Sequence, residues 1–142
     1  MTLIIAIGNT LRRDDGAAHR VVELLGEIPG ARILTCHQLM PEMAEDIAAA
    51  GRVVFVDADV EPGTARLEPL AETAGWSALG GHSVGPAEVV ALASKLYGFQ
   101  GEAWLCRAPG EDFGDGTGLS AAAEENARQA AALLREYLVR QA

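Results

Sequence analysis

The sequence is short of the features that mark several classes of protein. Its 142 residues include only two cysteines, Cys36 and Cys106, too few for the disulfide framework of a small secreted domain. Eleven Lys and Arg residues are scattered among twenty Asp and Glu residues, and the formal net charge of −9 disfavours binding to the phosphates of nucleic acids. We therefore expect both cysteines to be buried free thiols, and we expect no nucleic-acid partner.

Long apolar runs are also missing. The longest have the length of a β-strand, so none predicts a membrane-spanning helix. The first residues show neither the basic segment nor the small-residue cleavage site of a secretory signal. No linker, repeat or low-complexity tract divides the sequence. We expect a cytoplasmic protein without membrane association, a single domain over residues 1–142, and a monomer.

What the sequence does contain is a regular alternation of two patterns. Strand-like apolar runs occur at 3–7, 31–35, 52–57, 65–67 and 102–107, and helical spacing of apolar residues occurs at 16–25, 41–50, 86–96 and from Ser120 onward. The runs at 3–7 and 52–57 are continuous, which is typical of strands buried on both faces of a parallel sheet. This order predicts the α/β fold class, as a three-layer α/β/α sandwich with a mainly parallel, mixed sheet.

Polar residues gather where the predicted strands end. In open α/β sheets, ligands bind beyond the carboxyl ends of the strands, near the switch in strand order. This rule selects four groups of residues: Asn9 to Asp15, Cys36 with His37 and Gln38, Asp57 with Asp59, and the loop containing His82. Asp15 and Asp57 together would crowd two negative charges, so a proton or a cation must compensate them. Two carboxylates and one imidazole form a ligand set that suits nickel, zinc or manganese.

Each of these residues also has a simpler interpretation. Asp14 or Asp15 at a helix start commonly interacts with the helix dipole, and Asp57 at a strand end commonly caps a helix or forms a turn. A single histidine such as His82 is more often an ordinary loop residue. His19 lies four residues after Asp15 and is either a second ligand or a solvated residue at the edge of the helix stripe, and we favour the second interpretation.

Other catalytic motifs are absent. After the first strand, Gly8 is followed by no glycine until Gly16, and no Walker lysine follows, so neither a dinucleotide fingerprint nor a phosphate loop is present. Ser83 and Ser120 are not in nucleophile-elbow sequences. Cys36 and His37 are adjacent, but neighbours in a strand point to opposite faces and do not form a dyad. We do not expect Cys36 to be a nucleophile.

Four ordered segments resemble the maturation endopeptidases of nickel–iron hydrogenases. They are GNTLRRDDG at 8–16, HQLMPEMAEDIAA at 37–49, VFVDADVEPG at 54–63 and GHSVGPAEVVALA at 81–93, and the resemblance that they carry extends over most of the chain. The second segment is similar to that of the subgroup serving bidirectional, NAD-reducing hydrogenases. The family's fold, an α/β/α sandwich of the phosphorylase/hydrolase type, agrees with the strand and helix pattern.

The resemblance implies an aspartic-type endopeptidase that removes the C-terminal extension of a hydrogenase large-subunit precursor after nickel insertion. By matching motif positions, it implies that Asp15, Asp57 and His82 bind metal and act in catalysis. The nickel is expected to belong to the precursor, although zinc or cadmium can occupy such a site. Asn9, His37 and Gln38 adjoin the same crevice, and we expect them to contact the substrate.

The chain departs from the family pattern at two points that affect the site. Asp15 stands where many relatives carry the longer Glu, which shortens the reach of this ligand. Cys36-His37-Gln38-Leu39 replaces an Asp-Gly-Gly-Thr segment of other branches, so substrate choice is expected to differ. Two alternatives stay open: a metal-binding accessory protein without peptidase activity, and a small-molecule hydrolase on a similar scaffold.

Overall fold

The computed structural model describes residues 1–71 and 84–141. Within these ranges one sheet has the strand order β2-β1-β3-β5-β4. Its strands are β1 (Thr2–Ile7), β2 (Ala31–Cys36), β3 (Arg52–Asp59), β4 (Arg66–Pro69) and β5 (Glu102–Pro109). The strands β2, β1, β3 and β5 run parallel, and the edge strand β4 runs antiparallel to β5. The predicted α/β fold with a mixed, mainly parallel sheet is confirmed.

The helices begin and end at residues suited to those positions. They are the short 3-10 helix η1 (Arg13–Gly16) and the α-helices α1 (Ala17–Leu25), α2 (Met43–Ala49), α3 (Pro86–Tyr97) and α4 (Ala121–Arg140). Pro86 opens α3, where its missing N–H costs nothing, and Gly98 ends it in the left-handed conformation at φ 71°. The Ser120 hydroxyl accepts a hydrogen bond of 3.2 Å from the Ala123 N–H and so caps α4, as predicted.

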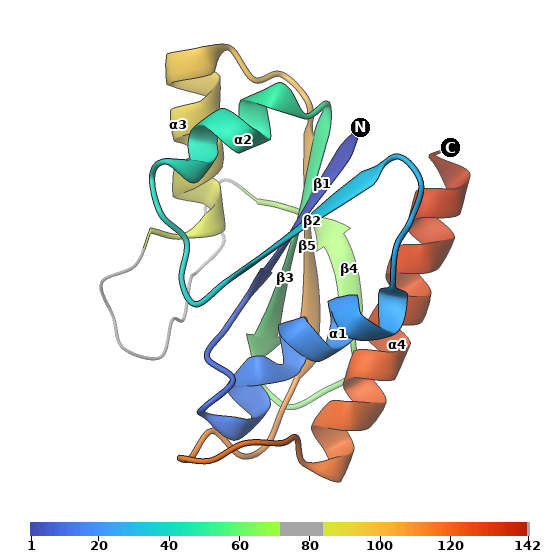
Figure 1. Cartoon of the computed structure of the whole chain (residues 1–142). Helices are drawn as coiled ribbons and strands as arrows, with labels where there is room; N and C mark the ends of the chain where they lie inside the picture. Colours follow the sequence, from blue (N-terminus) through green and yellow to red (C-terminus); the bar gives the residue numbers. More distant parts are fainter. Residues whose placement is uncertain (72–83, 142) are drawn as a thin grey trace.

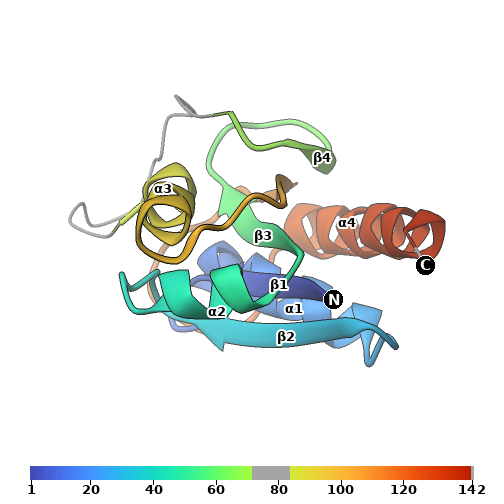
Figure 2. The same cartoon turned by 90° about the horizontal axis from the view of Figure 1, so that it is seen from above.

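Two pairs of helices cover the two faces of the sheet. Figure 1 shows α1 and α4 on one side and α2 and α3 on the other, and Figure 2 shows the same layers from above. Alternate residues of β3 divide between two apolar clusters, with Val54 and Val56 facing α1 and α4, and Val53 and Phe55 facing α2 and α3. The central strands β1 and β3 are therefore buried from both sides, which explains their continuous apolar runs.

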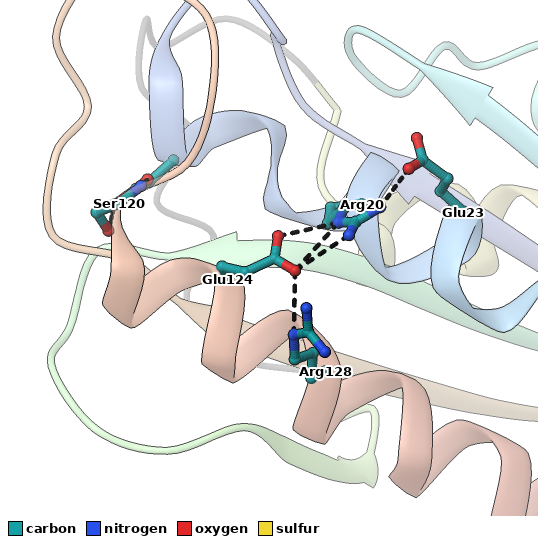
Figure 3. Close-up of polar contacts among 6 residues, drawn as sticks. Arg20, Glu23, Ser120, Glu124 and Arg128 are labelled. Carbon is teal, nitrogen blue, oxygen red and sulfur yellow. Dashed lines mark hydrogen bonds and ion pairs between the residues drawn. The ribbon is translucent and has the colours of Figure 1, made fainter.

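Helices α1 and α4 are also joined by charged side chains. Arg20 of α1 donates from its Nε to the Glu124 carboxylate of α4 at 2.9 Å, and it also pairs with Glu23 of its own helix. Arg128 donates to the same Glu124 carboxylate at 3.2 Å, so this acid receives two arginines (Figure 3). The pairs lie at the partly exposed edge of the contact between the helices, which also pack together through buried apolar residues of both.

The observed boundaries differ from the predicted ones mainly at strand ends. Strand β3 continues two residues beyond Asp57, because Ala58 and Asp59 still pair with Ala108 and Pro109 of β5. Asp57 is thus a strand residue, so the interpretation of it as a cap or turn residue is wrong. Among the described residues, no helix combines the length and apolar character needed to cross a bilayer.

Candidate functional site

The candidate site lies where the strand order switches. From β1 the chain forms β2 on one side of that strand and then returns to form β3 on its other side, so β1 and β3 flank the switch point. The segment after β1 carries Asn9 to Asp15, and β3 carries Asp57 near its carboxyl end. These are the strand ends at which the rule for open α/β sheets places a ligand.

The sheet register aligns four residues across this end. Cys36 of β2 pairs with Ile7 of β1, Ile7 pairs with Asp57 of β3, and Asp57 pairs with Arg107 of β5. In-register residues of parallel strands point to the same face, and Ile7 and Cys36 belong to the cluster facing α2 and α3. Asp57 and Arg107 therefore point to that face too.

Asp15 is held in place by the backbone of the turn that follows β1. The Asn9 N–H donates a hydrogen bond of 2.8 Å to Asp15 Oδ2. Gly8 has φ 155°, and a Cβ built on it would lie 1.9 Å from the Asp15 carbonyl oxygen. Only glycine permits this close approach, so the absence of a side chain at Gly8 allows the backbone of Asp15 to lie where it does.

Asp57 is an acid whose protonation depends on its burial and on the charge of Asp15. Burial, and then the negative charge of Asp15, raise the pKa of Asp57 from 3.8 to about 8, although hydrogen bonding at the Ala58 backbone and the charge of Arg107 oppose this rise. The carboxyl of Asp57 is therefore mainly protonated at neutral pH in the absence of a cation. A divalent cation at this position would replace that proton and relieve the repulsion between the acids.

The two cysteines lie on opposite faces of the sheet. Cys36 belongs to the cluster facing α2 and α3, and Cys106 is buried among residues facing α1 and α4. Both are free thiols as predicted, but Cys36 is only half-buried. Burial, and then the charge of Asp57, raise the pKa of Cys36 to about 11, so its thiol is protonated at neutral pH and is a poor nucleophile.

Asp14 has a role that the sequence patterns did not reveal. It is fully buried, and its carboxylate accepts hydrogen bonds from the Glu111 N–H at 2.8 Å and the Asp112 N–H at 2.9 Å. It also accepts from the Ser120 N–H at 2.7 Å and the Ser120 hydroxyl at 2.6 Å. Burial raises the pKa of Asp14, but these hydrogen bonds outweigh it and hold the pKa below its ordinary value. Asp14 thus ties the segment carrying Asp15 to the loop before α4.

The residues expected to contact the substrate differ in their solvent exposure and in the hydrogen bonds that they already make. Asn9 is half-buried, and its side-chain oxygen accepts from the Leu11 N–H at 2.9 Å, so it stabilises its own turn. His37 and Gln38 are exposed immediately after β2, while the next residue, Leu39, is buried in the cluster facing α2 and α3. His37 and Gln38 are therefore accessible beside the carboxyl end of β2.

The histidines have different positions. His82 lies outside the described residues, so its relation to Asp15 and Asp57 stays a prediction. His19 Nε2 lies 2.8 Å from the Gly8 carbonyl oxygen. This hydrogen-bond contact ties the His19 ring to the backbone just after β1. Among residues 1–71 and 84–141, no three His, Cys, Asp or Glu side chains gather as a metal-binding group.

The fold is that of known hydrogenase maturation endopeptidases. The structure of the endopeptidase HybD from E. coli superposes with a TM-score of 0.82 at 21% sequence identity, covering 99% of this chain and 93% of that chain. The nickel–iron hydrogenase maturation protease HycI from Thermococcus kodakarensis KOD1 has a TM-score of 0.71 at 26% identity, covering 95% and 90%. HybD from Thermococcus kodakarensis has a TM-score of 0.72 at 20% identity, covering 96% and 97%.

Sequence comparison gives no such match. No protein-family model matches this chain, and no curated protein does. The relationship is therefore visible in the backbone over nearly the whole chain, and these likenesses establish the fold. The α/β sandwich predicted from the sequence is confirmed by them as well as by the observed sheet.

Proposed function

We propose that this chain is a maturation endopeptidase that removes the C-terminal extension of a nickel–iron hydrogenase large-subunit precursor. The observation that carries the proposal is the backbone match to the E. coli endopeptidase HybD over 99% of this chain. In this proposal the whole of residues 1–142 acts as one catalytic domain, monomeric and cytoplasmic.

The metal in the proposed reaction belongs to the substrate. Asp15, Asp57 and His82 would contact the nickel already installed in the precursor, which fixes the position of the cleavage site. Support for two members of this set comes from the negative charge of Asp15, which contributes to the raised pKa of Asp57 at the strand ends. A cation held there acts as a Lewis acid toward a carbonyl group or a water molecule. Asp57 then contributes as a ligand, as the base, or as both.

Substrate choice is proposed to depend on the segment after β2. His37 and Gln38 are exposed there, and Leu39 anchors the segment in the core below α2 and α3. The resemblance of residues 37–49 to the subgroup serving bidirectional, NAD-reducing hydrogenases supports a precursor from such an enzyme. Cleavage of that precursor in preference to a large-subunit precursor of another hydrogenase class would test this choice.

The experiment that tests the function uses precursor in two forms. Nickel-loaded precursor incubated with the protein is expected to lose its C-terminal extension, detected as a mass decrease, and nickel-free precursor is expected to stay intact. Asp15→Asn, Asp57→Asn and His82→Ala should each abolish cleavage, while Asp115→Asn, at an exposed loop position, should not.

Three outcomes would contradict the proposal in different ways. Normal cleavage by all three site variants would overturn the assignment of the site. Tight binding of loaded precursor without any cleavage would indicate a non-proteolytic accessory protein. Turnover of a small substrate in the absence of any hydrogenase protein would indicate a hydrolase of another class on the same scaffold.

A further inference from the structure

Arg107 is a charged residue that the sequence patterns did not connect with the site. It lies in β5 and pairs in register with Asp57 of β3. Leu105, two residues earlier, packs in the cluster facing α2 and α3, so strand alternation directs Arg107 to the face of Asp57. Its guanidinium is close enough to oppose the effects of burial and of Asp15 on the pKa of Asp57.

The guanidinium has hydrogen-bonding capacity left over. Among the described residues, the buried Nε of Arg107 has no hydrogen-bond partner. Nε lies 3.8 Å from Glu68 Oε1, and Nη1 lies 3.8 Å from Asp59 Oδ1, and both separations are longer than a hydrogen bond. A buried donor without an acceptor is unfavourable and uncommon, so its retention at the carboxyl end of the sheet, in register with Asp57, points to an acceptor that arrives with a ligand.

The neighbouring acid does not require Arg107 as its partner. Asp59 is 2% exposed, and its Oδ2 accepts a hydrogen bond of 2.7 Å from Arg66 Nη2. Its Oδ1 accepts from the Glu61 N–H at 3.0 Å. Both oxygens of Asp59 thus have shorter contacts with other donors, and Arg107 adds only a longer ion pair of 3.8 Å to this acid.

The surroundings decide which kind of acceptor fits. Three carboxyl groups lie around Arg107, those of Asp57, Asp59 and Glu68, on a chain whose formal net charge is −9. A further carboxylate would be repelled, whereas a neutral carbonyl oxygen accepts a charge-assisted hydrogen bond without adding charge. A protein substrate presents such an oxygen at every residue.

We infer that Arg107 is a substrate-binding residue whose guanidinium donates a hydrogen bond to a main-chain carbonyl oxygen of the precursor segment lying across the Asp57 end of the sheet. The inference rests on the proposed function for the identity of the substrate. It adds to the acidic residues of the site a cationic donor that orients the peptide chain beside them.

The experiment compares Arg107→Gln and Arg107→Lys with the matched control Arg66→Gln. Arg66 faces Arg107 across the β4–β5 register and carries the same charge. Single-turnover cleavage of nickel-loaded precursor with enzyme in excess gives the half-saturating enzyme concentration and the maximal rate separately. If the wild-type protein binds the precursor without cleaving it, the proposed function is contradicted. In that case, calorimetric titration of the uncleaved precursor still measures the affinity and so still tests the role of Arg107.

Arg107→Gln is expected to weaken precursor affinity by about tenfold or more, with a smaller change in maximal rate. Arg107→Lys should recover little, because an ammonium group cannot place a donor where Nε lies. Unchanged affinity in folded Arg107→Gln protein, full recovery by Arg107→Lys, or an equal loss in Arg66→Gln would each overturn the inference. If Arg107→Gln does not fold, as judged by its melting curve, folded Arg107→Lys with wild-type affinity would overturn it.

Discussion

Gly8 connects a buried strand to the turn that carries Asp15, and it tolerates no side chain there. We predict that Gly8→Ala lowers the free energy of unfolding by at least about 2 kcal/mol, because a Cβ would collide with the Asp15 backbone. Gly63 is a matched control, since its φ is 149° and open space surrounds its Cβ position. Urea denaturation of Gly8→Ala and Gly63→Ala separates the collision from the backbone strain that both share. Equal losses in the two variants would refute the positional role of Gly8.

In the folded protein the protonated form of the Asp57 carboxyl is favoured, so ionisation of Asp57 lowers the free energy of unfolding. Its pKa rises from 3.8 to about 8 on folding, so between these values the folded state holds a proton that the unfolded state has lost. Stability must therefore fall as the pH rises through this window. Metal-free Asp57→Asn should exceed the wild-type free energy of unfolding by about 1 to 3 kcal/mol near about pH 9, and the gap should close toward about pH 4.

Denaturant titrations at several pH values measure this gap, with Asp115→Asn as the control for removing an exposed acid. The opposite trend, a variant less stable than wild type at alkaline pH, would show that burial and the charge of Asp15 do not disfavour ionised Asp57. A divalent cation bound at Asp57 should reduce the alkaline destabilisation of the wild-type protein, and its affinity should rise with pH because binding displaces the proton.

At the scale of elements, the 3-10 helix η1 and the loop before α4 are joined by the side chain of Asp14. Asp14 joins them through four hydrogen bonds to Glu111, Asp112 and Ser120. We predict that Asp14→Asn lowers the free energy of unfolding by about 2 kcal/mol or more, because the amide presents two N–H groups to donors that need acceptors. Asp115→Asn, in the same loop, should change stability little.

The pH dependence of this contribution has the opposite sign to that of Asp57. The pKa of Asp14 is lowered on folding, so its contribution is complete above the ordinary value of 3.8 and is lost as the pH falls through the lower folded value. The difference between wild type and Asp14→Asn should therefore shrink in acid. Limited proteolysis between residues 110 and 120 should also become faster in Asp14→Asn, and unchanged cleavage there would refute the link between the two segments.

The element pattern was readable from the sequence because it follows from local physics. Continuous apolar runs predicted β1 and β3, and Pro86, Gly98 and Ser120 marked helix ends through properties of single residues. Strand ends were predicted less well, since the continuation of β3 to Asp59 depends on pairing with β5. The rule that ligands bind beyond the carboxyl ends of parallel strands also directed attention to Asp15 and Asp57. It needs only the positions of the strand ends, which the sequence predicts.

The roles of Asp14 and Arg107 could not be read in the same way. The hydrogen bonds of Asp14 join residues that are 97 to 106 positions apart, and no local spacing encodes such contacts. Arg107 meets Asp57 only because the register of β3 and β5 aligns them. A sequence shows that an acid or an arginine ends a strand, but the partner depends on how the sheet assembles.

At the scale of the whole molecule, one sheet separates two apolar layers, so damage to either layer should be felt by both. Leu134 of α4 is fully buried in the layer facing α1, whereas Leu96 of α3 is 66% exposed. Leu134→Ala should lower the free energy of unfolding by about 2 to 5 kcal/mol, and Leu96→Ala should change it little. Circular dichroism and Trp fluorescence should report one shared transition, and separate transitions for the two signals would show that unfolding is not a single cooperative event.

The Asp14 contacts also order events during synthesis on the ribosome. The growing chain contains Asp15 and Asp57 once β3 has been made, but the carboxylate of Asp14 lacks its hydrogen-bond donors until Glu111, Asp112 and Ser120 have been added. The turn that carries Asp15 is therefore secured only after most of the polypeptide has been translated. A growing chain therefore contains these acidic residues early but acquires the contacts that fix their geometry late, so a partly made copy lacks the arrangement that the proposed function requires.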